Sequence, residues 1–283
     1  MNRRIVVAAG GAAVGAALLL SGCNGDGSGT GANGNMKLSA NEALLKSSQK
    51  TGQADTFKAD LTVTGTGGDK IHANGQFRLR PVLKFSAKLD EFSHGGQSIP
   101  GLKGQAVYTD NVLYAKVPQL AQFVSGGKPW VKIDANQAAK GTGLDVQDLV
   151  KQVQNVDPAG QTKMFTGSKD ARRVGTETID GVKTTHYTGT VTVQDALNRL
   201  DAQAREKVRG WLPKDDANAK INFDLWTDGD NLPRKLVSKG TGPQGESGSV
   251  TVLYSDYGKS FGVNPPPSDQ VGQLSLGSFL GGN

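Results

Sequence analysis

The chain has 283 residues, a single cysteine, 39 glycines and a formal net charge of +6, and these values exclude several classes of protein. One thiol allows neither an internal disulfide nor a cysteine-based metal site. The small charge excess is spread singly along the chain, whereas a nucleic-acid-binding protein needs a basic patch or stripe. The many glycines and few aromatic residues favour turns and short strands over a helical bundle.

The first 22 residues have the layout of a secretory signal peptide. Arg3 and Arg4 precede an uncharged apolar stretch at positions 5–20, which ends in Leu20-Ser21-Gly22-Cys23. A positive segment, an apolar segment and a small-residue processing site follow each other in this order in such signals. The apolar stretch is shorter than the roughly 20 residues that a membrane-spanning helix needs. We therefore expect residues 1–22 to be a signal peptide.

Leu20-Ser21-Gly22-Cys23 resembles the lipobox of bacterial lipoproteins. The resemblance implies a diacylglyceryl thioether on Cys23, cleavage before it and acylation of the new amino terminus. Two or three acyl chains give a stable anchor, at about 0.8 kcal/mol per buried methylene. We expect the cell membrane, on its extracytoplasmic face, as the location, with residues 23–35 as the lipidated terminus and a flexible Gly/Ser linker. The alternative is an ordinary secreted protein with a stray cysteine.

The segment after the linker begins with a predicted helix and continues with strands. Ser39 and Glu42 form a capping-box pattern, which predicts a helix of about three turns through Lys50. From Phe57 onward apolar and polar residues alternate, as in antiparallel strands with one wet and one apolar face. Strands are predicted near residues 57–63, 76–80, 83–89, 104–109, 112–117, 130–133, 172–179, 182–193, 221–226, 234–239 and 249–254.

Turn and helix signals separate these strands. Asp110-Asn111 and Asp180-Gly181 are two-residue hairpin turns, and Asp228 to Asn231 turns one late strand into the next. Helical spacing recurs over 144–153, before Pro158, and from Leu197 to Trp211. Pro265-Pro266-Pro267 is expected to end regular structure, which leaves 264–283 as a Pro/Gly/Ser-rich tail. Because helices do not alternate regularly with strands, we predict an α+β domain over 36–263, with a curved antiparallel sheet and helices on one face.

The sequence contains no catalytic or metal-binding constellation. Gly240 to Gly245 spells G-x-G-x-x-G, but predicted strands flank it and Pro243 removes an amide, so we interpret it as a hairpin loop. His72, His94 and His186 are far apart in the sequence, with His186 on the wet face of its strand. We therefore expect no cofactor, no metal and no enzymatic activity.

Several stretches resemble LppX and the LprA/LprF/LprG lipoproteins, the LolA-like group of actinobacterial envelope proteins. They are Ile179 to Gly189, Phe223 to Asp228, Asn231 to Lys235, Tyr254 to Gly258 and Lys128 to Ile133. The resemblance covers most of the chain after Cys23, and the order of the motifs carries it. It implies a half-barrel antiparallel sheet closed by helices around a hydrophobic cavity, and a part in carrying lipids or lipoglycans across the envelope.

A sheet with such a cavity would direct one face of its strands inward. The predicted cavity residues are Phe57, Leu61, Val63, Phe77, Leu79, Phe85, Leu113, Val131, Tyr187, Ile221, Phe223 and Leu225. Periodicity alone does not distinguish a lipid pocket from a packed core. We predict a monomeric carrier of a lipid or glycolipid, with no nucleic-acid partner. The alternative function is a lipid-sensing module that contacts another envelope protein.

Overall fold

The computed structural model describes residues 38–98, 103–116, 118, 121–134, 157–202, 205, 218–241 and 247–274. The chain divides into two compact units, Met1–Thr30 and Gly31–Asn283, and every described element lies in the second. The signal peptide, the lipidation site Cys23, the linker and the helix predicted over 144–153 lie outside the described residues. No helix within the described ranges is long and apolar enough to cross a bilayer.

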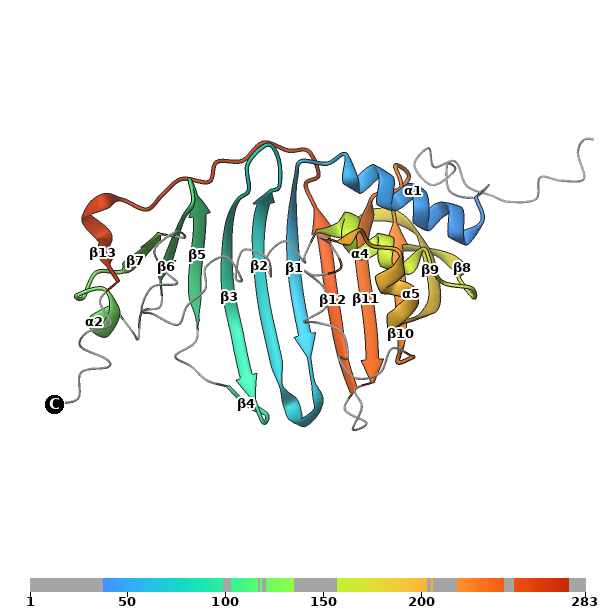
Figure 1. Ribbon diagram of the computed structural model, residues 1–283, viewed down its shortest axis with the longest axis horizontal. Coiled ribbons are helices and arrows are strands. Elements are labelled where there is room, and N and C mark those ends of the chain that lie inside the picture. The colour runs from blue at the N-terminus through green and yellow to red at the C-terminus, as the bar shows by residue number, and fades with distance from the viewer. Residues whose placement is uncertain are drawn as a thin grey trace, which may run out of the picture. The chain divides into compact units, whose positions relative to one another are not determined.

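The second unit is built on one sheet (Figure 1). The strand order across it is β13-β7-β6-β5-β3-β2-β1-β12-β11-β10-β9-β8, and β4 pairs with β3. The strands are β1 (Thr56–Thr64), β2 (Lys70–Arg78), β3 (Lys84–His94), β4 (Gln97–Ser98), β5 (Gly104–Thr109), β6 (Val112–Lys116), β7 (Trp130–Asp134), β8 (Arg172–Ile179), β9 (Val182–Thr192), β10 (Lys220–Thr227), β11 (Pro233–Thr241), β12 (Ser247–Ser255) and β13 (Val271–Gln273).

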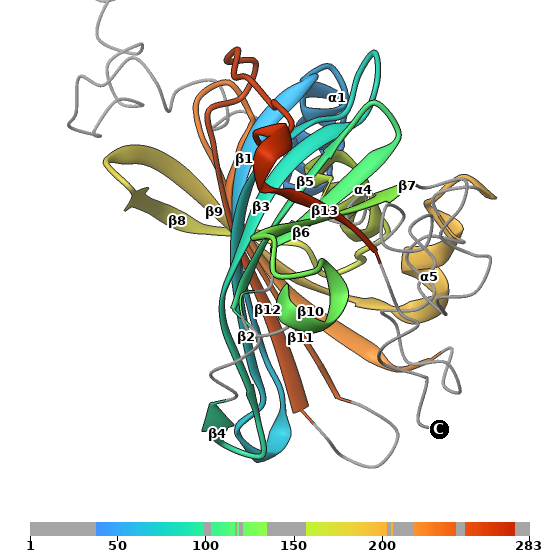
Figure 2. The same ribbon diagram turned by 90° about the vertical axis from the view of Figure 1, so that its left-hand side faces the viewer.

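The sheet is strongly curved and twisted, and helices α4 and α5 lie on one side of it (Figure 2). Its pairs are antiparallel, apart from β13, which runs parallel to β7. The prediction of an α+β fold with a curved antiparallel sheet is therefore confirmed. The predicted domain boundaries at 36 and 263 stay a prediction.

The hairpin turns are those that the sequence predicts. Asp110 and Asn111 have φ values of 52° and 62°, and Asp180 and Gly181 have 47° and 78°. Positive φ at both central residues defines the type I′ turn, whose twist matches that of the flanking strands. The two-residue signals therefore fix the register of β5 with β6 and of β8 with β9.

The helices whose bounds lie within the described residues are α1 (Ala40–Gly52), α2 (Ala121–Val124), α4 (Pro158–Phe165) and α5 (Val193–Asn198), with 3-10 turns η2 (Thr66–Gly68) and η6 (Ser268–Gln270). The capping box that starts α1 is present, because the backbone N–H of Ser39 donates to Glu42 Oε2 and that of Glu42 donates to Ser39 Oγ. The predicted first helix is confirmed.

The structure adds one helix that the sequence analysis did not predict and corrects the bounds of another. Helix α4 begins at Pro158, because Pro158 fits the first helical position and Asp157 caps the N-terminus. Helix α5 begins four residues before Leu197, directly after β9, and ends at Asn198. Within the stretch predicted as one helix up to Trp211, Ala202 and Arg205 are again helical, and residues 206–211 lie outside the described ranges. Thr192 caps the N-terminus of α5, because its Oγ1 accepts a hydrogen bond from the backbone N–H of Asp195 at 3.0 Å.

The C-terminal segment also departs from expectation, since it contains regular structure after the three prolines. From the end of β12 it crosses one end of β1, β2 and β3 (Figure 1), where Thr56 and Arg78 donate to the carbonyls of Lys259 and Phe261. Beyond Pro267 it forms η6 and then β13, which pairs with β7. The prolines redirect the chain along the sheet, and the predicted tail adds an edge strand.

Asp256, at the start of this segment, is expected to stabilise the fold in a way that is lost in acid. Asp256 contacts Lys58 at 2.7 Å and Lys259 at 2.6 Å, and the hydrogen bonds from Lys259 and then Lys58 lower the pKa of Asp256 to about 2. A lowered pKa means that the contribution is present above the ordinary aspartate pKa near 4 and is lost as the pH falls toward 2. We expect the difference in urea midpoint between the wild type and Asp256→Asn to shrink from pH 6 to pH 2. An equal difference at both values would contradict this assignment.

Candidate functional site

Strand register places the two sets of alternating side chains on opposite faces of the sheet, because directly paired residues point to the same side. We call the face that carries Phe57, Phe77 and Phe223 the inner face, and the opposite one the outer face. Phe165 of α4 stacks on Phe223 with the ring centroids 4.5 Å apart, so the inner face is the one that the helices cover.

A row of aromatic rings crosses the inner face at one end of the strands. Phe57, Phe77, Phe85 and Tyr108 stand in register on β1, β2, β3 and β5. Successive ring centroids are 5.3, 6.1 and 5.5 Å apart, within the usual range for aromatic pairs. Leu113 and Ile133 continue this row onto β6 and β7. Burial raises the pKa of the Tyr108 hydroxyl, which donates to Asn111 Oδ1 at 2.9 Å.

Small residues form the next row. Ala59, Gly75, Ala87, Ala106 and Ala115 are aligned across β1, β2, β3, β5 and β6. In the row after that, Leu61 on β1 and Leu89 on β3 alternate with Ala73 on β2 and Gly104 on β5. The inner face of these strands is therefore apolar over several successive rows.

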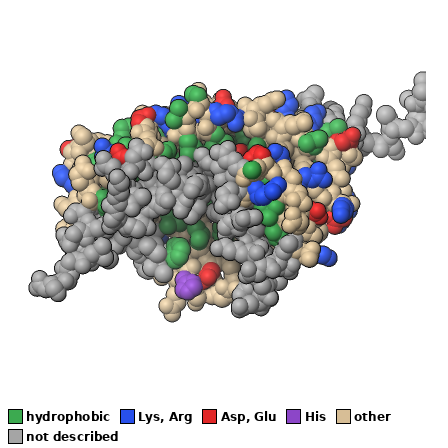
Figure 3. Space-filling view, viewed as in Figure 1, with side chains coloured by type: hydrophobic (Ala, Val, Ile, Leu, Met, Phe, Trp, Pro, Cys, Tyr) green, Lys and Arg blue, Asp and Glu red, His purple; other side chains and the backbone are tan. Residues whose placement is uncertain are grey.

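The inner face is unevenly covered. Leu44 of α1, Met164 and Phe165 of α4 and Ala196 of α5 join the buried cluster that contains Phe223 and Leu225. Over the middle strands the apolar side chains are only half-buried; they are Leu61, Val63, Ile71, Ala73, Ala87, Leu89, Phe92, Ala106, Ala115 and Val250. Hydrophobic side chains also reach the surface in the middle of this face (Figure 3). This region is the candidate site.

The predicted cavity residues all fall on the inner side, but they divide into two groups. Buried in the core cluster are Phe57, Phe77, Phe85, Leu113, Val131, Ile221, Phe223 and Leu225. Leu61 and Leu79 are partly buried and pack against that cluster, and Val63 is half-buried. Tyr187 is fully buried with an unpartnered hydroxyl, and burial raises its pKa. Whether any of them contacts a lipid stays a prediction.

The sequence analysis left out several inner-face residues. Tyr108, Leu236, Val252 and Tyr254 all belong to the buried cluster. Each lies on a predicted strand, but each has an apolar neighbour, which is Val107, Val237 or Leu253, so strict alternation does not single it out. Ala59 and the other small residues carry a weaker signal, because alanine and glycine do not stand out in an apolar pattern.

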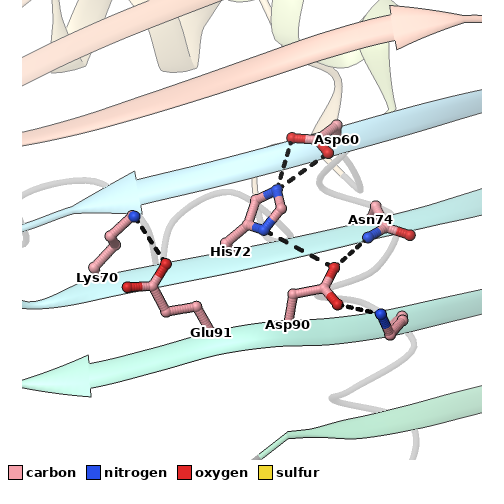
Figure 4. A network of polar contacts seen from close by, with 7 residues as sticks. Asp60, Lys70, His72, Asn74, Asp90 and Glu91 are labelled. Atoms are coloured by element: carbon pink, nitrogen blue, oxygen red, sulfur yellow. Dashed lines mark hydrogen bonds and ion pairs between the residues drawn. The ribbon is translucent and has the colours of Figure 1, made fainter. Parts of the chain in front are cut away.

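The outer face is polar and carries a charged network over β1, β2 and β3 (Figure 4). His72 Nε2 is 3.1 Å from both carboxylate oxygens of Asp60, and Lys88 contacts Asp90 at 2.5 Å. Further along, His186 lies between Glu177 and Asp224 at 2.9 Å each and stacks on Trp226. His186 is thus on the wet face as predicted, though its side chain is only 12% exposed.

The other motifs have structural roles within the described residues. Strands β11 and β12 flank the G-x-G-x-x-G stretch as predicted, and residues 242–246 lie outside the described ranges. Asp228 is buried in its turn and binds Arg234 at 2.6 Å. Among the residues that the structure covers, no group of three His, Cys, Asp or Glu side chains could hold a metal ion.

Comparison with known proteins identifies bacterial relatives. An uncharacterized 31.2 kDa protein from the rplA–rplJ intergenic region of Streptomyces griseus is 28% identical over 80% of this chain and 68% of its own length. A Streptomyces coelicolor protein whose name contains the word lipoprotein is 28% identical over 81% of this chain and 64% of its own length. This chain thus spans about two thirds of these relatives. No family model matches.

Among solved structures, the Mycobacterium tuberculosis lipoprotein LppX aligns with 80% of this chain and 98% of its own, with a TM-score of 0.47 and 15% identity. The chain is similar to actinobacterial lipoproteins of the LppX type. The resemblance predicted from the sequence is confirmed at this level.

Close packing around Gly189 of β9 gives a prediction on stability. A Cβ at Gly189 would lie 2.7 Å from Ser168 Oγ and 2.8 Å from Phe223 Cζ, closer than any relaxed contact. We expect Gly189→Ala to lower the free energy of unfolding by about 1–3 kcal/mol, as overpacking does. Gly175→Ala in β8 is the matched control, since nothing lies within 4 Å of its Cβ position. Equal urea midpoints for the two variants would contradict this packing.

Proposed function

We propose that this chain is a lipoprotein, anchored through Cys23 on the extracytoplasmic side of the cell membrane, that binds the acyl chains of a lipid or glycolipid. The half-buried apolar region of the inner face carries the proposal. Soluble proteins rarely leave contiguous apolar area at the surface without a use for it. The similarity to lipoproteins supports the anchor.

The inner face suits acyl chains because its middle is apolar, extended and without charge. The half-buried apolar side chains around Leu61 and Ala87 extend over several strands, and an acyl chain would lie along them. Each methylene removed from water contributes about 0.8 kcal/mol, so several methylenes give useful affinity without specific polar contacts. Carboxylates and ammonium groups instead gather on the outer face, in the network around His72 and Asp90 (Figure 4).

Native mass spectrometry of the compact unit over residues 31–283 tests the binding. Purified from bacterial cells under mild conditions, it is expected to carry lipid adducts or to take up added palmitate. Circular dichroism establishes that the protein is folded before the measurement. A folded protein that carries no lipid and takes up no palmitate contradicts the proposal.

Carrying, as opposed to sensing, is a further part of the proposal. We expect the protein to speed the movement of a fluorescent lipid from donor to acceptor vesicles in proportion to its concentration. Crosslinking in intact membranes distinguishes the alternative, because a sensor would be captured with a single protein partner at fixed stoichiometry. Transfer without such a partner supports a carrier.

A further inference from the structure

The outer face holds a hollow of about 680 Å³ that the lipid-binding proposal does not use. Strands β1, β2, β3, β5 and β12 form its floor. Asp180, at the tip of the β8–β9 hairpin, also lines it, although it is far from most of these strands in the sequence. Figure 2 shows that this hairpin bends away from the sheet on the side opposite α4 and α5. The lining residues are Lys58, Ala59, Asp60, Asn74, Gly75, Gln76, Ser86, Ala87, Lys88, Gln105, Asp180, Leu253, Tyr254 and Ser255.

The outward-facing side chains of the floor form two polar rows. Lys58, Gln76 and Ser86 are aligned across β1, β2 and β3, and Asp60, Asn74, Lys88 and Gln105 form the second row, which extends to β5. Ser86, Gln105 and Ser255 make no side-chain hydrogen bond within the described part of the chain. The hollow thus offers hydroxyl and amide groups that both donate and accept hydrogen bonds.

The charged side chains that line the hollow balance, with Lys58 and Lys88 against Asp60 and Asp180. Lys58 is paired with Asp256 at 2.7 Å, Lys88 with Asp90 at 2.5 Å, and Asp60 with His72 at 3.1 Å. The lining therefore has no surplus of positive charge to hold an anion, and no surplus of negative charge to hold a cation. A ligand that is polar but uncharged fits this arrangement best.

Two other ligand classes fit less well. The floor strands β1, β2 and β3 are each paired on both sides, so they have no unpaired edge to which an extended peptide could add a strand. A hydrocarbon tail would bury the amide and hydroxyl groups without hydrogen-bond partners, which is costly. A volume of about 680 Å³ is in the range of sites for small organic ligands.

We propose that this hollow binds a neutral, polyhydroxylated ligand, a saccharide of a few sugar units, between the hairpin tip and the polar rows. The saccharide hydroxyls would exchange hydrogen bonds with Ser86, Gln105 and Ser255, and Leu253 would contact a sugar carbon face. The proposal is independent of lipid binding, because it uses the opposite face of the sheet.

Ligand-observed NMR titration of the full chain, in a polyoxyethylene detergent that contains no sugar, tests the proposal. The probes are neutral trisaccharides of glucose, galactose, mannose and N-acetylglucosamine, with trigalacturonic acid and a Gly-Ser-Gly-Ser peptide for comparison. At least one neutral trisaccharide is expected to bind, and more tightly than the acid or the peptide. A parallel titration with the same trisaccharide on a lipid in vesicles distinguishes a free glycan from a glycolipid headgroup.

Variants locate the binding. Ser86→Ala and Gln105→Ala are each expected to weaken it about five- to tenfold, the effect of losing one hydrogen bond. Gln97→Ala, on the short strand β4 outside the hollow, is the matched control and should bind like the wild type. All three should keep the wild-type circular dichroism and palmitate uptake. The proposal is overturned if no neutral trisaccharide binds, if the acid or peptide binds as well, or if Gln97→Ala weakens binding as much as Gln105→Ala.

Discussion

Replacing Leu61 by glutamate is expected to weaken palmitate binding by roughly tenfold or more, because a carboxylate would stand in the apolar region of the inner face. Leu61 is half-buried there, and the adjacent Thr62 points to the outer face. Thr62→Glu is therefore the matched control, with the same added charge one residue away. Fluorescence displacement with a labelled fatty acid measures both affinities.

Two outcomes of this comparison are informative. Equal loss in both variants would show that charge on β1 disturbs the fold, and equal retention would place the lipid elsewhere. If Leu61→Glu does not fold, Ala106→Trp provides a second route, because it fills the row of small residues without adding charge. Ala106 is half-buried on β5 and directly opposite Ala87 of β3. This variant is also expected to lose palmitate binding.

The second large effect concerns stability. Asp228 Oδ1 accepts the backbone N–H groups of Asp230 and Leu232 at 3.0 and 2.9 Å, and Oδ2 accepts Arg234 Nε at 2.7 Å. The Asp228 side chain is only 6% exposed. Asp228→Ala would leave the partly buried guanidinium of Arg234 and two backbone donors without these acceptors. We expect the free energy of unfolding to fall by about 3–5 kcal/mol.

Asp230→Ala is the control for this prediction. Asp230 belongs to the same turn but its side chain is exposed, so its loss should change the free energy of unfolding by no more than about 0.5 kcal/mol. Urea unfolding at neutral pH measures both variants. Similar losses for Asp228→Ala and Asp230→Ala would mean that turn conformation, and not the buried ion pair, determines stability here.

Much of the fold could be predicted because its signals are local. The period of two identifies strands such as β1 and β3 and tells which side chains share a face, and Asp180-Gly181 fixes a hairpin by backbone conformation alone. The capping box at Ser39 and Glu42 likewise satisfies backbone groups within one turn. By contrast, the parallel pairing of Val271–Gln273 with β7 depends on a contact across the whole sheet, which no local pattern encodes.

The candidate site could be predicted only in part. Alternation assigned Phe57, Leu61 and Phe223 to one face, but burial in a core and contact with a lipid require the same apolar side chains. How the helices cover the face decides between the two, and α4, one of these helices, was not predicted from the sequence. The outer hollow was beyond prediction, because it forms only where the hairpin tip at Asp180 approaches strands that lie early in the chain.

Photo-crosslinking tests the central claim most directly, because it reports where the acyl chain lies. A palmitate analogue with a diazirine on its chain, irradiated with the protein and followed by peptide mass spectrometry, should label inner-face residues such as Leu61, Ala87 and Ala106. Excess unlabelled palmitate should suppress this labelling. Labelling confined to outer-face residues such as Thr62 and Lys88, or labelling that unlabelled palmitate does not suppress, would contradict the assignment of the inner face as the lipid-binding site.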